Sequence, residues 1–464
     1  MDKNGSKLIS GALILGGGAF IAKVLGAVYR IPLTKIIGGT GLGLYQMVFP
    51  VYALLLDLSG AGVPNAMAKL ISAERGADKE IYARKILKVS LIFFAAVGAV
   101  LSFITAVFSG AFSIAQGNGN ARLAYIALAP SIFLVCLICC FRGYFQGFMN
   151  MAHTAVSQII EQTVKLAAGL IIAKAFLPDI PKAVAGATLA ITLSEFIALT
   201  VLLITYLIKR KRLSLSDLGL IKLDKREFGI TLKKIISYSI PIALTGMILP
   251  ISKVIDSFFI VNFLSEYSEN ATGIYGVYSG VAITVIGLPV AVCYGISAVS
   301  VPLLSAAEES GRTKSAVRAV LLTLIFSVPC ALLCAFGAPI IIKILFGYLG
   351  AGEKHLAIAL LRILSPCVVL LSLLQTLNGI LIGKDSPKKP LIGMTVGVIV
   401  KTLIEIFTLK NPEIGIYGAA VAAIACYLIA DLVNFMLVFP LKSKKRIKAK
   451  NAGSGVKIGG CAHL

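Results

Sequence analysis

Long apolar runs alternate with short polar loops along almost the whole chain. A run of about 20 apolar residues is long enough to cross the hydrocarbon core of a bilayer as an α-helix. The pattern predicts about twelve such spans, at residues 8–29, 43–67, 89–112, 123–147, 154–177, 183–208, 235–263, 274–303, 317–346, 357–382, 390–410 and 416–440. We therefore expect an all-α polytopic membrane protein.

Composition supports this class and changes how the charge is interpreted. The 464 residues are 58% hydrophobic and 14% charged, with a formal net charge of +23. In a soluble domain that charge would suggest nucleic acid, but here most Lys and Arg fall in the loops on one side of the predicted spans. The positive-inside rule then places both termini in the cytoplasm. The largest clusters, at residues 209–212 and 442–450, are expected to lie near anionic lipid headgroups, so membrane lipids rather than nucleic acid are the expected partners.

Several functional classes are not supported by the sequence. The first apolar run is too long for the core of a signal peptide, so we expect it to be a retained span. Nine cysteines fall mostly inside spans, and there are three histidines, which gives no metal-site spacing. Nucleotide-binding and hydrolase motifs are also missing. We expect no metal, no cofactor and no enzymatic activity.

The two halves of the chain resemble each other. Lys23 and the two residues after it match Lys253 and its two followers, and Lys165 matches Lys401. Six spans in each half make the repeats parallel, related by an axis along the membrane normal. The expected organisation is a six-helix bundle at 1–208, a basic linker at 209–234, a second six-helix bundle at 235–440 and a basic tail at 441–464.

Five cations lie inside or at the ends of predicted spans. A charge near the membrane centre costs about 2.5 to 3.5 kcal/mol, so such residues usually face a cavity or a partner. Cations from both halves facing one space would suit an anionic ligand such as a phosphate or pyrophosphate. The alternative is that each side chain reaches a headgroup or pairs locally. The candidates are Lys23, Arg30, Lys165, Lys253 and Lys401.

Intramembrane acids lie within reach of these cations. Glu161 precedes Lys165 by four residues, Asp256 follows Lys253 by three and Glu405 follows Lys401 by four, spacings at which helical side chains meet. Each acid is either half of a structural salt bridge or a coupling-ion or proton site. The sequence leaves both open. The remaining intramembrane acids are Asp57, Glu195 and Asp431.

Two stretches resemble a known family. The run AKVLGAVYRIPLTKIIGGTGLGLYQMVFPVY from residue 22, followed by SGAGVP and AKLISAERG, is similar to the opening of the stage V sporulation protein B branch of polysaccharide transporters. The later run GLPVAVCYGISAVSVPLLSAAEESGR resembles that branch's second half. The branch belongs to the multidrug/oligosaccharidyl-lipid/polysaccharide (MOP) exporter superfamily, together with lipid II flippases and multidrug extruders.

The resemblance implies a V-shaped two-bundle transporter in the bacterial plasma membrane. Its expected activity is to move a saccharide linked to a polyprenyl diphosphate to the outer leaflet by alternating access. In the lipid II flippases cavity cations contact the diphosphate, and Lys23 is the best-matching position here, with Arg30 a weaker match. Those flippases have two further spans that line a groove for the lipid tail. Their absence here favours the alternative of a cation-coupled multidrug antiporter, and a non-transporting scaffold for envelope synthesis is a third hypothesis.

Overall fold

The structure, a computed structural model, describes residues 3–60, 62–74, 79–211, 224–293, 309–384 and 388–439. This part of the chain is helical and contains no strand. The predicted basic tail and most of the basic cluster after residue 208 lie outside it. The helices are α1 (Lys3–Ser59), α2 (Val63–Ala73), α3 (Lys79–Val107), α4 (Ser109–Ala115), η1 (Gly119–Ala121), α5 (Arg122–Gly147), α6 (Met151–Ala175), α7 (Ile180–Lys211), α8 (Lys225–Ser265), α9 (Ala271–Tyr275), η3 (Gly276–Ala282), α11 (Glu309–Phe336), α12 (Ala338–Phe346), α13 (Ala351–Leu364), α14 (Pro366–Gly383), α15 (Lys389–Thr408) and α16 (Ile416–Val438).

A break at Gly38 divides α1 into two passes. Gly38 has φ 69° and ψ −175°, a backbone conformation that glycine adopts at little cost. The two passes lie against each other, because the rings of Tyr29 and Tyr45 are 6.4 Å apart. The loop predicted at 30–42 is therefore helical except at this break. The sequence pattern missed this because polar Thr and Lys near the turn interrupt the apolar run without ending the helix.

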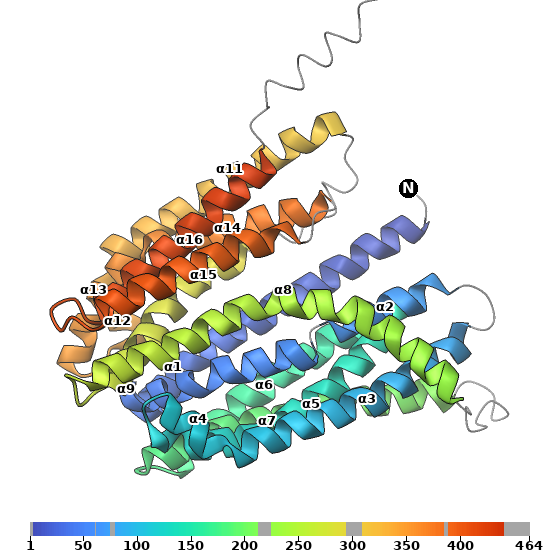
Figure 1. Cartoon of the computed structure of the whole chain (residues 1–464), viewed down its shortest axis with the longest axis horizontal. Coiled ribbons are helices and arrows are strands. Elements are labelled where there is room, and N and C mark those ends of the chain that lie inside the picture. Colours follow the sequence, from blue (N-terminus) through green and yellow to red (C-terminus); the bar gives the residue numbers. More distant parts are fainter. Residues whose placement is uncertain are drawn as a thin grey trace, which may run out of the picture.

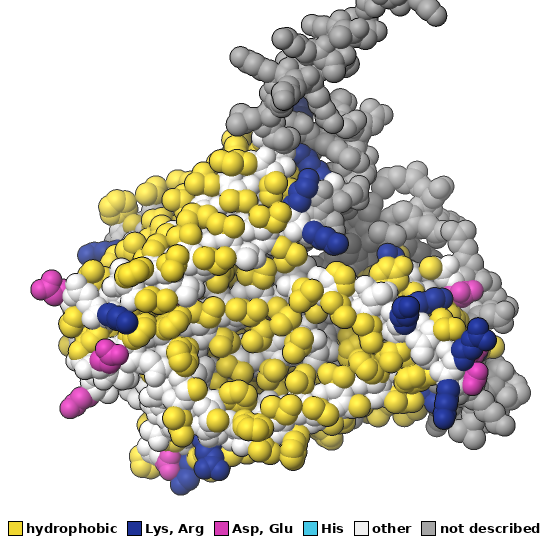
Figure 2. Space-filling view, in the orientation of Figure 1, with side chains coloured by type: hydrophobic (Ala, Val, Ile, Leu, Met, Phe, Trp, Pro, Cys, Tyr) yellow, Lys and Arg dark blue, Asp and Glu magenta, His cyan; other side chains and the backbone are white. Residues whose placement is uncertain are grey.

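The surface has the distribution of a membrane protein. Hydrophobic side chains cover a broad belt, and charged side chains gather toward its two ends (Figure 2). Large apolar residues such as Phe336 are up to 80% exposed within this belt. The described chain has 11 helices long and apolar enough to cross a membrane, and the first contains both passes of α1. The predicted all-α fold of about twelve spans is confirmed.

Two predicted spans are interrupted. The span at 317–346 is formed by α11 and α12, which meet at Gly337, and the span at 357–382 by α13 and α14, which begins with Pro366. Proline has no backbone N–H to continue a preceding helix, so it starts a new one. The hydrophobicity of the sequence does not indicate where these two spans break. The end of the predicted span 274–303 lies outside the described residues.

The helices form two lobes that meet at one end only. We call this the far end; it holds Gly38, and the chain begins at the opposite, near end. At the far end a single buried apolar cluster contains residues of both halves, from Tyr29 to Ala423. At the near end there are two clusters, one around Met67 and Phe145, which takes residues of the second half from α8 alone, and another around Leu377 within the second half. The lobes therefore diverge toward the near end, as Figure 1 shows.

Helix α8 belongs to both lobes. Ile235, in its first part, is fully buried in the near-end cluster of the N-terminal half. Ile260 and Leu264, in its last part, are buried in the far-end cluster. Pro241 and Pro250 lie between these parts, where each removes a helical hydrogen bond. The long helix runs along the boundary between the two halves (Figure 1).

Candidate functional site

Glycines close the far end of the space between the lobes. On α1, Gly39 and Gly43 lie one turn apart, and on the opposing segment Gly276 and Gly280 have the same spacing. A Cβ on Gly43 would overlap the carbonyl oxygen of Thr272, and one on Gly276 would overlap the backbone of Gly39 and Gly43. The two backbones therefore touch directly. We call this contact between α1 and the α9–η3 segment the far-end seam.

Hydrogen bonds between the halves reinforce the far-end seam. Gln46 donates to the carbonyl and hydroxyl oxygens of Ser279, at 2.9 and 3.1 Å. Tyr348 donates to the carbonyl of Ile31 at 2.5 Å. Burial raises the pKa of Tyr348 to about 12, so its phenol keeps this proton at any physiological pH. Further bonds join Thr40 to Asn270, Asn118 to Thr272, Gln116 to Ser257, and Asn262 to the carbonyl of Ala115.

Arg30 bridges the halves just inside the far-end seam. Its guanidinium donates to the hydroxyl of Thr284 at 3.0 Å. The same group lies 5.7 Å from the centre of the Phe49 ring, a cation–π geometry. Arg30 is half-buried and has no carboxylate partner among the described residues. Its charge therefore remains available where the two lobes meet.

Lys253 and Lys165 also lack an ion-pair partner in the described part of the chain. Lys253 is exposed in the middle of α8, where the charges of Arg30 and Lys401 repel it and that of Asp256 attracts it. Lys165 is buried, with its ammonium 6.0 Å from the centre of the Tyr29 ring. In the described part of the chain neither lysine has a carboxylate within ion-pair distance. The helix that carries Lys23 is described, but the Lys23 side chain lies outside the described atoms.

The fifth candidate cation, Lys401, is neutralised. Its ammonium forms an ion pair with Asp256, donates to the hydroxyl of Ser252 at 3.1 Å and lies 3.8 Å from Glu405. Lys401 is 4% exposed and Glu405 is fully buried. The predicted contact of Asp256 with Lys253 is therefore wrong, because Asp256 turns to Lys401 on α15 instead. The predicted proximity of Lys401 and Glu405 is confirmed.

Glu161 has a partner that the spacing did not indicate. It pairs with Arg142 of α5 at 3.0 Å and accepts a hydrogen bond from Gln162. The local pair with Lys165 is therefore absent, since the guanidinium on the neighbouring helix takes the carboxylate. Tyr52 donates to Glu195 nearby at 3.3 Å. The rule that identified the lysines, a cation inside an apolar run, applies equally to Arg142.

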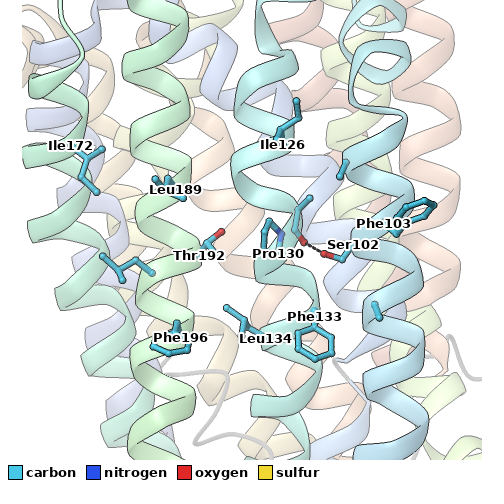
Figure 3. A pocket seen from close by; sticks show the side chains of 14 residues that line it. Ser102, Phe103, Ile126, Pro130, Phe133, Leu134, Ile172, Leu189, Thr192 and Phe196 are labelled. Carbon is cyan, nitrogen blue, oxygen red and sulfur yellow. Dashed lines mark hydrogen bonds between the residues drawn. The ribbon is translucent and has the colours of Figure 1, made fainter.

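A separate apolar pocket lies within the N-terminal lobe, between α3, α5 and α7. Its volume is about 930 Å³, and Figure 3 shows Phe103, Pro130 and Phe196 among its lining side chains. The hydroxyl of Ser102 donates to the carbonyl of Ala129, so it does not project a free polar group. None of the candidate cations lines this pocket. It cannot hold an anionic headgroup.

Comparison with protein-family models gives two matches. The model described as "Polysaccharide biosynthesis protein" matches residues 8–308, and the model described as "MatE" matches residues 241–407. The first match spans well over half of the chain and includes the far-end seam, while the second lies within the C-terminal half.

Relatives and solved structures agree with these matches. The chain is 26% identical to stage V sporulation protein B of Bacillus subtilis over 92% of its own length and 82% of that protein. It is 26% identical to the lipid II flippase MurJ of the same organism, over 93% and 82%. An inward-facing multidrug MATE transporter has the same fold, with a TM-score of 0.73 at 17% identity over 93% of this chain and 96% of that one. The chain thus belongs to the polysaccharide biosynthesis protein family and is a multi-pass membrane transporter of the MOP superfamily.

Proposed function

We propose that this transporter moves a saccharide linked to a lipid diphosphate across the bacterial plasma membrane by alternating access. The observation that carries the proposal is the set of cations without carboxylate partners, Arg30, Lys165 and Lys253, which come from both halves. Guanidinium and ammonium groups are the usual ligands of phosphate oxygens. The similarity to a lipid II flippase of Bacillus subtilis is consistent with such cargo.

The asymmetry of the lobes supports a direction of loading. The space between them is closed at the far end and widens toward the near end. With both termini in the cytoplasm, as the excess of Lys and Arg in the loops favours, the near end faces the cytoplasm. A precursor made there would enter this state, and breaking the far-end seam would release it outward. A diphosphate group that enters from the near end would then meet the cations that have no carboxylate partner.

The test is transport by purified protein in vesicles with a fluorescent polyprenyl-diphosphate sugar. A charge-assisted contact contributes about 1.5 to 3 kcal/mol, which corresponds to roughly 10- to 150-fold in affinity. We expect the double variant Lys165→Gln/Lys253→Gln to lower the initial transport rate at least about 10-fold. We expect the triple variant, which adds Lys23→Gln, to show no transport. Lys343→Gln, an exposed lysine of α12, is the matched control. Unchanged transport by the triple variant would refute the proposal.

A cation-coupled multidrug antiporter is the second candidate, favoured by the MatE match over residues 241–407. Such a transporter would export cationic drugs, which positive side chains repel. The candidate cations Arg30, Lys165 and Lys253 have no carboxylate within ion-pair distance among the described residues, and the carboxylates Asp256 and Glu161 are already paired. Efflux of a cationic dye that is faster than lipid transport, and unaffected by the lysine substitutions, would favour this candidate instead.

A further inference from the structure

Asp431 is a buried acid without a partner. It lies on α16, two turns from the end of that helix, and is 7% exposed. Both carboxylate oxygens lack a hydrogen-bond donor in the described part of the chain, and no cation there lies within ion-pair distance of them. An ionised carboxylate in such surroundings would lose its hydration without compensation, whereas the neutral acid would not.

Four other acids of the membrane region have partners. Asp57 on α1, which is half-buried, forms no ion pair among the described residues. Glu161 binds Arg142, Asp256 binds Lys401, and Glu195 accepts a hydrogen bond from Tyr52. Glu405, although it accepts no hydrogen bond, has the Lys401 ammonium 3.8 Å away. Asp431 is therefore different from the carboxylates of the two charge networks, and it lies on α16, which contributes to neither.

Polar groups without full partners continue along the same helix. Asn434 is fully buried one turn beyond Asp431, and its side-chain oxygen has no donor among the described residues. Its amide nitrogen donates to the side-chain oxygen of Asn378 on α14 at 2.8 Å, and Asn378 is partly exposed. A Cβ on Gly393 of α15 would press on the Asn434 oxygen. The two amides thus connect the helix turn beyond the buried acid to a side chain that is partly exposed.

The helices packed on α16 supply no counter-charge to Asp431. Ala430, which precedes Asp431, is buried in one apolar cluster with Met394 of α15, and Ile248 and Leu249 of α8 pack on this cluster. Among the described residues no charged or titratable group of these elements forms a hydrogen bond or an ion pair with Asp431. These groups include Lys253 and Asp256 on α8, Lys401 and Glu405 on α15, Glu353, Lys354, His355 and Arg362 on α13, Cys367 on α14, and, at the near end, Lys388, Lys389 and Lys384, whose ammonium donates to the carbonyl of Val438.

We propose that Asp431, with Asn434 and Asn378, forms a proton-binding site in the C-terminal lobe, and that transport exchanges this proton. The coupling role rests on the proposed transport function, whereas the protonation of Asp431 does not. The described residues contain no group of three or more His, Cys, Asp or Glu that could hold a metal ion, and the sodium dependence measured below distinguishes a proton from an alkali cation. Water at the near end takes up the proton from the carboxyl when the amides rearrange, and returns it when they close.

Infrared spectroscopy of the purified protein tests protonation without any substrate. At neutral pH we expect a carbonyl stretch of a protonated, solvent-shielded carboxylic acid that is missing in Asp431→Asn. Asp431→Glu should retain a shifted band, which keeps the test decisive if the Asn variant does not fold. Asp224→Asn, an exposed aspartate before α8, is the matched control and should leave the band unchanged. A difference spectrum between the wild type and Asp431→Asn that lacks such a band, or a band that requires removal of sodium to appear, would overturn the site.

Transport in vesicles tests the coupling. An imposed pH gradient should change the initial transport rate of the wild type, the Asp224→Asn control and Asp431→Glu, and should have no effect on Asp431→Asn. If the gradient response persists in Asp431→Asn, the coupling role is wrong. If the wild type moves no lipid-linked saccharide but still shows the Asp431 band, the proposed function fails while the proton site stands.

Discussion

Lys401 illustrates how a charge can be structural although its sequence position suggests a ligand site. It lies between Asp256 and Glu405 with almost no exposure. Removing it would leave two carboxylates buried without a cation, and breaking a buried ion pair in this way costs about 3 to 5 kcal/mol. We expect Lys401→Met to lower the thermal unfolding temperature of the detergent-purified protein markedly, and Lys343→Met, on an exposed face, to leave it unchanged.

A second variant separates this role from a role in cargo binding. Lys401→Met combined with Asp256→Asn and Glu405→Gln removes the whole network, and replacing a buried ion pair by neutral groups is often tolerated. Recovery of the unfolding temperature in the triple variant is the expected result. A Lys401→Met protein as stable as the wild type would contradict the structural role.

The charged residues show what spacing along a helix can predict. Proximity of Lys401 and Glu405 follows from their four-residue separation and is observed. The partners of Glu161 and Asp256 lie on other helices, and a single sequence does not specify which helices are neighbours. Spacing within one helix therefore gave the wrong partner for both acids. That Asp431 has no partner among the described residues was also not predictable, because it depends on the side chains that four other helices, α8, α13, α14 and α15, place beside α16.

The α1 helix depends on glycine at the far-end seam. A Cβ on Gly43 would overlap the carbonyl oxygen of Thr272, and overpacking of this kind costs about 1 to 3 kcal/mol, which shifts a two-state ratio roughly 5- to 150-fold. We expect Gly43→Ala to favour states in which the far end is open. The measurement is the rate at which an impermeant maleimide labels a cysteine introduced at Ser279.

The same helix provides the control for this prediction. Gly17 has nothing within 4 Å of the position its Cβ would take, so Gly17→Ala should leave the labelling rate at the wild-type value. Equal labelling in the two glycine variants would mean that the glycines do not govern closure.

At this scale the sequence predicted the presence of helices better than their ends. Apolar runs located every membrane crossing, because burial in lipid requires them. Backbone geometry determines the break of α1 at Gly38 and the division of two spans at Gly337 and Pro366. The hydrophobicity of the sequence does not indicate these positions. The chain has 44 glycines, and the sequence alone does not indicate which of them form the far-end seam.

For the whole molecule, the prediction is that transport requires the far-end seam to open and close. The hydroxyl of Thr40 donates to the side-chain oxygen of Asn270 across the seam at 3.3 Å, so Thr40→Cys with Asn270→Cys should cross-link on oxidation. We expect the oxidised protein to lose transport and to regain it after reduction. Each single cysteine variant is a control for the oxidant, and full transport by the cross-linked protein would exclude alternating access through this end.

The repeat in the sequence, with lysines that recur at corresponding places, predicts two six-helix halves, and this division stays a prediction. The sharing of α8 was not predictable from it. Similarity between repeats reports common descent, whereas membership of a core depends on which surfaces meet, and Ile235 meets the N-terminal half.

The shared α8 helix has a consequence for biosynthesis. The near-end core of the N-terminal half includes Ile235 of α8, a residue that is synthesised after that half. Its maturation therefore waits for synthesis of the second half to begin. A nascent chain halted before α8 would lack the part of the near-end core that α8 contributes. We expect membrane quality control to recognise this incomplete bundle even if its other helices are folded.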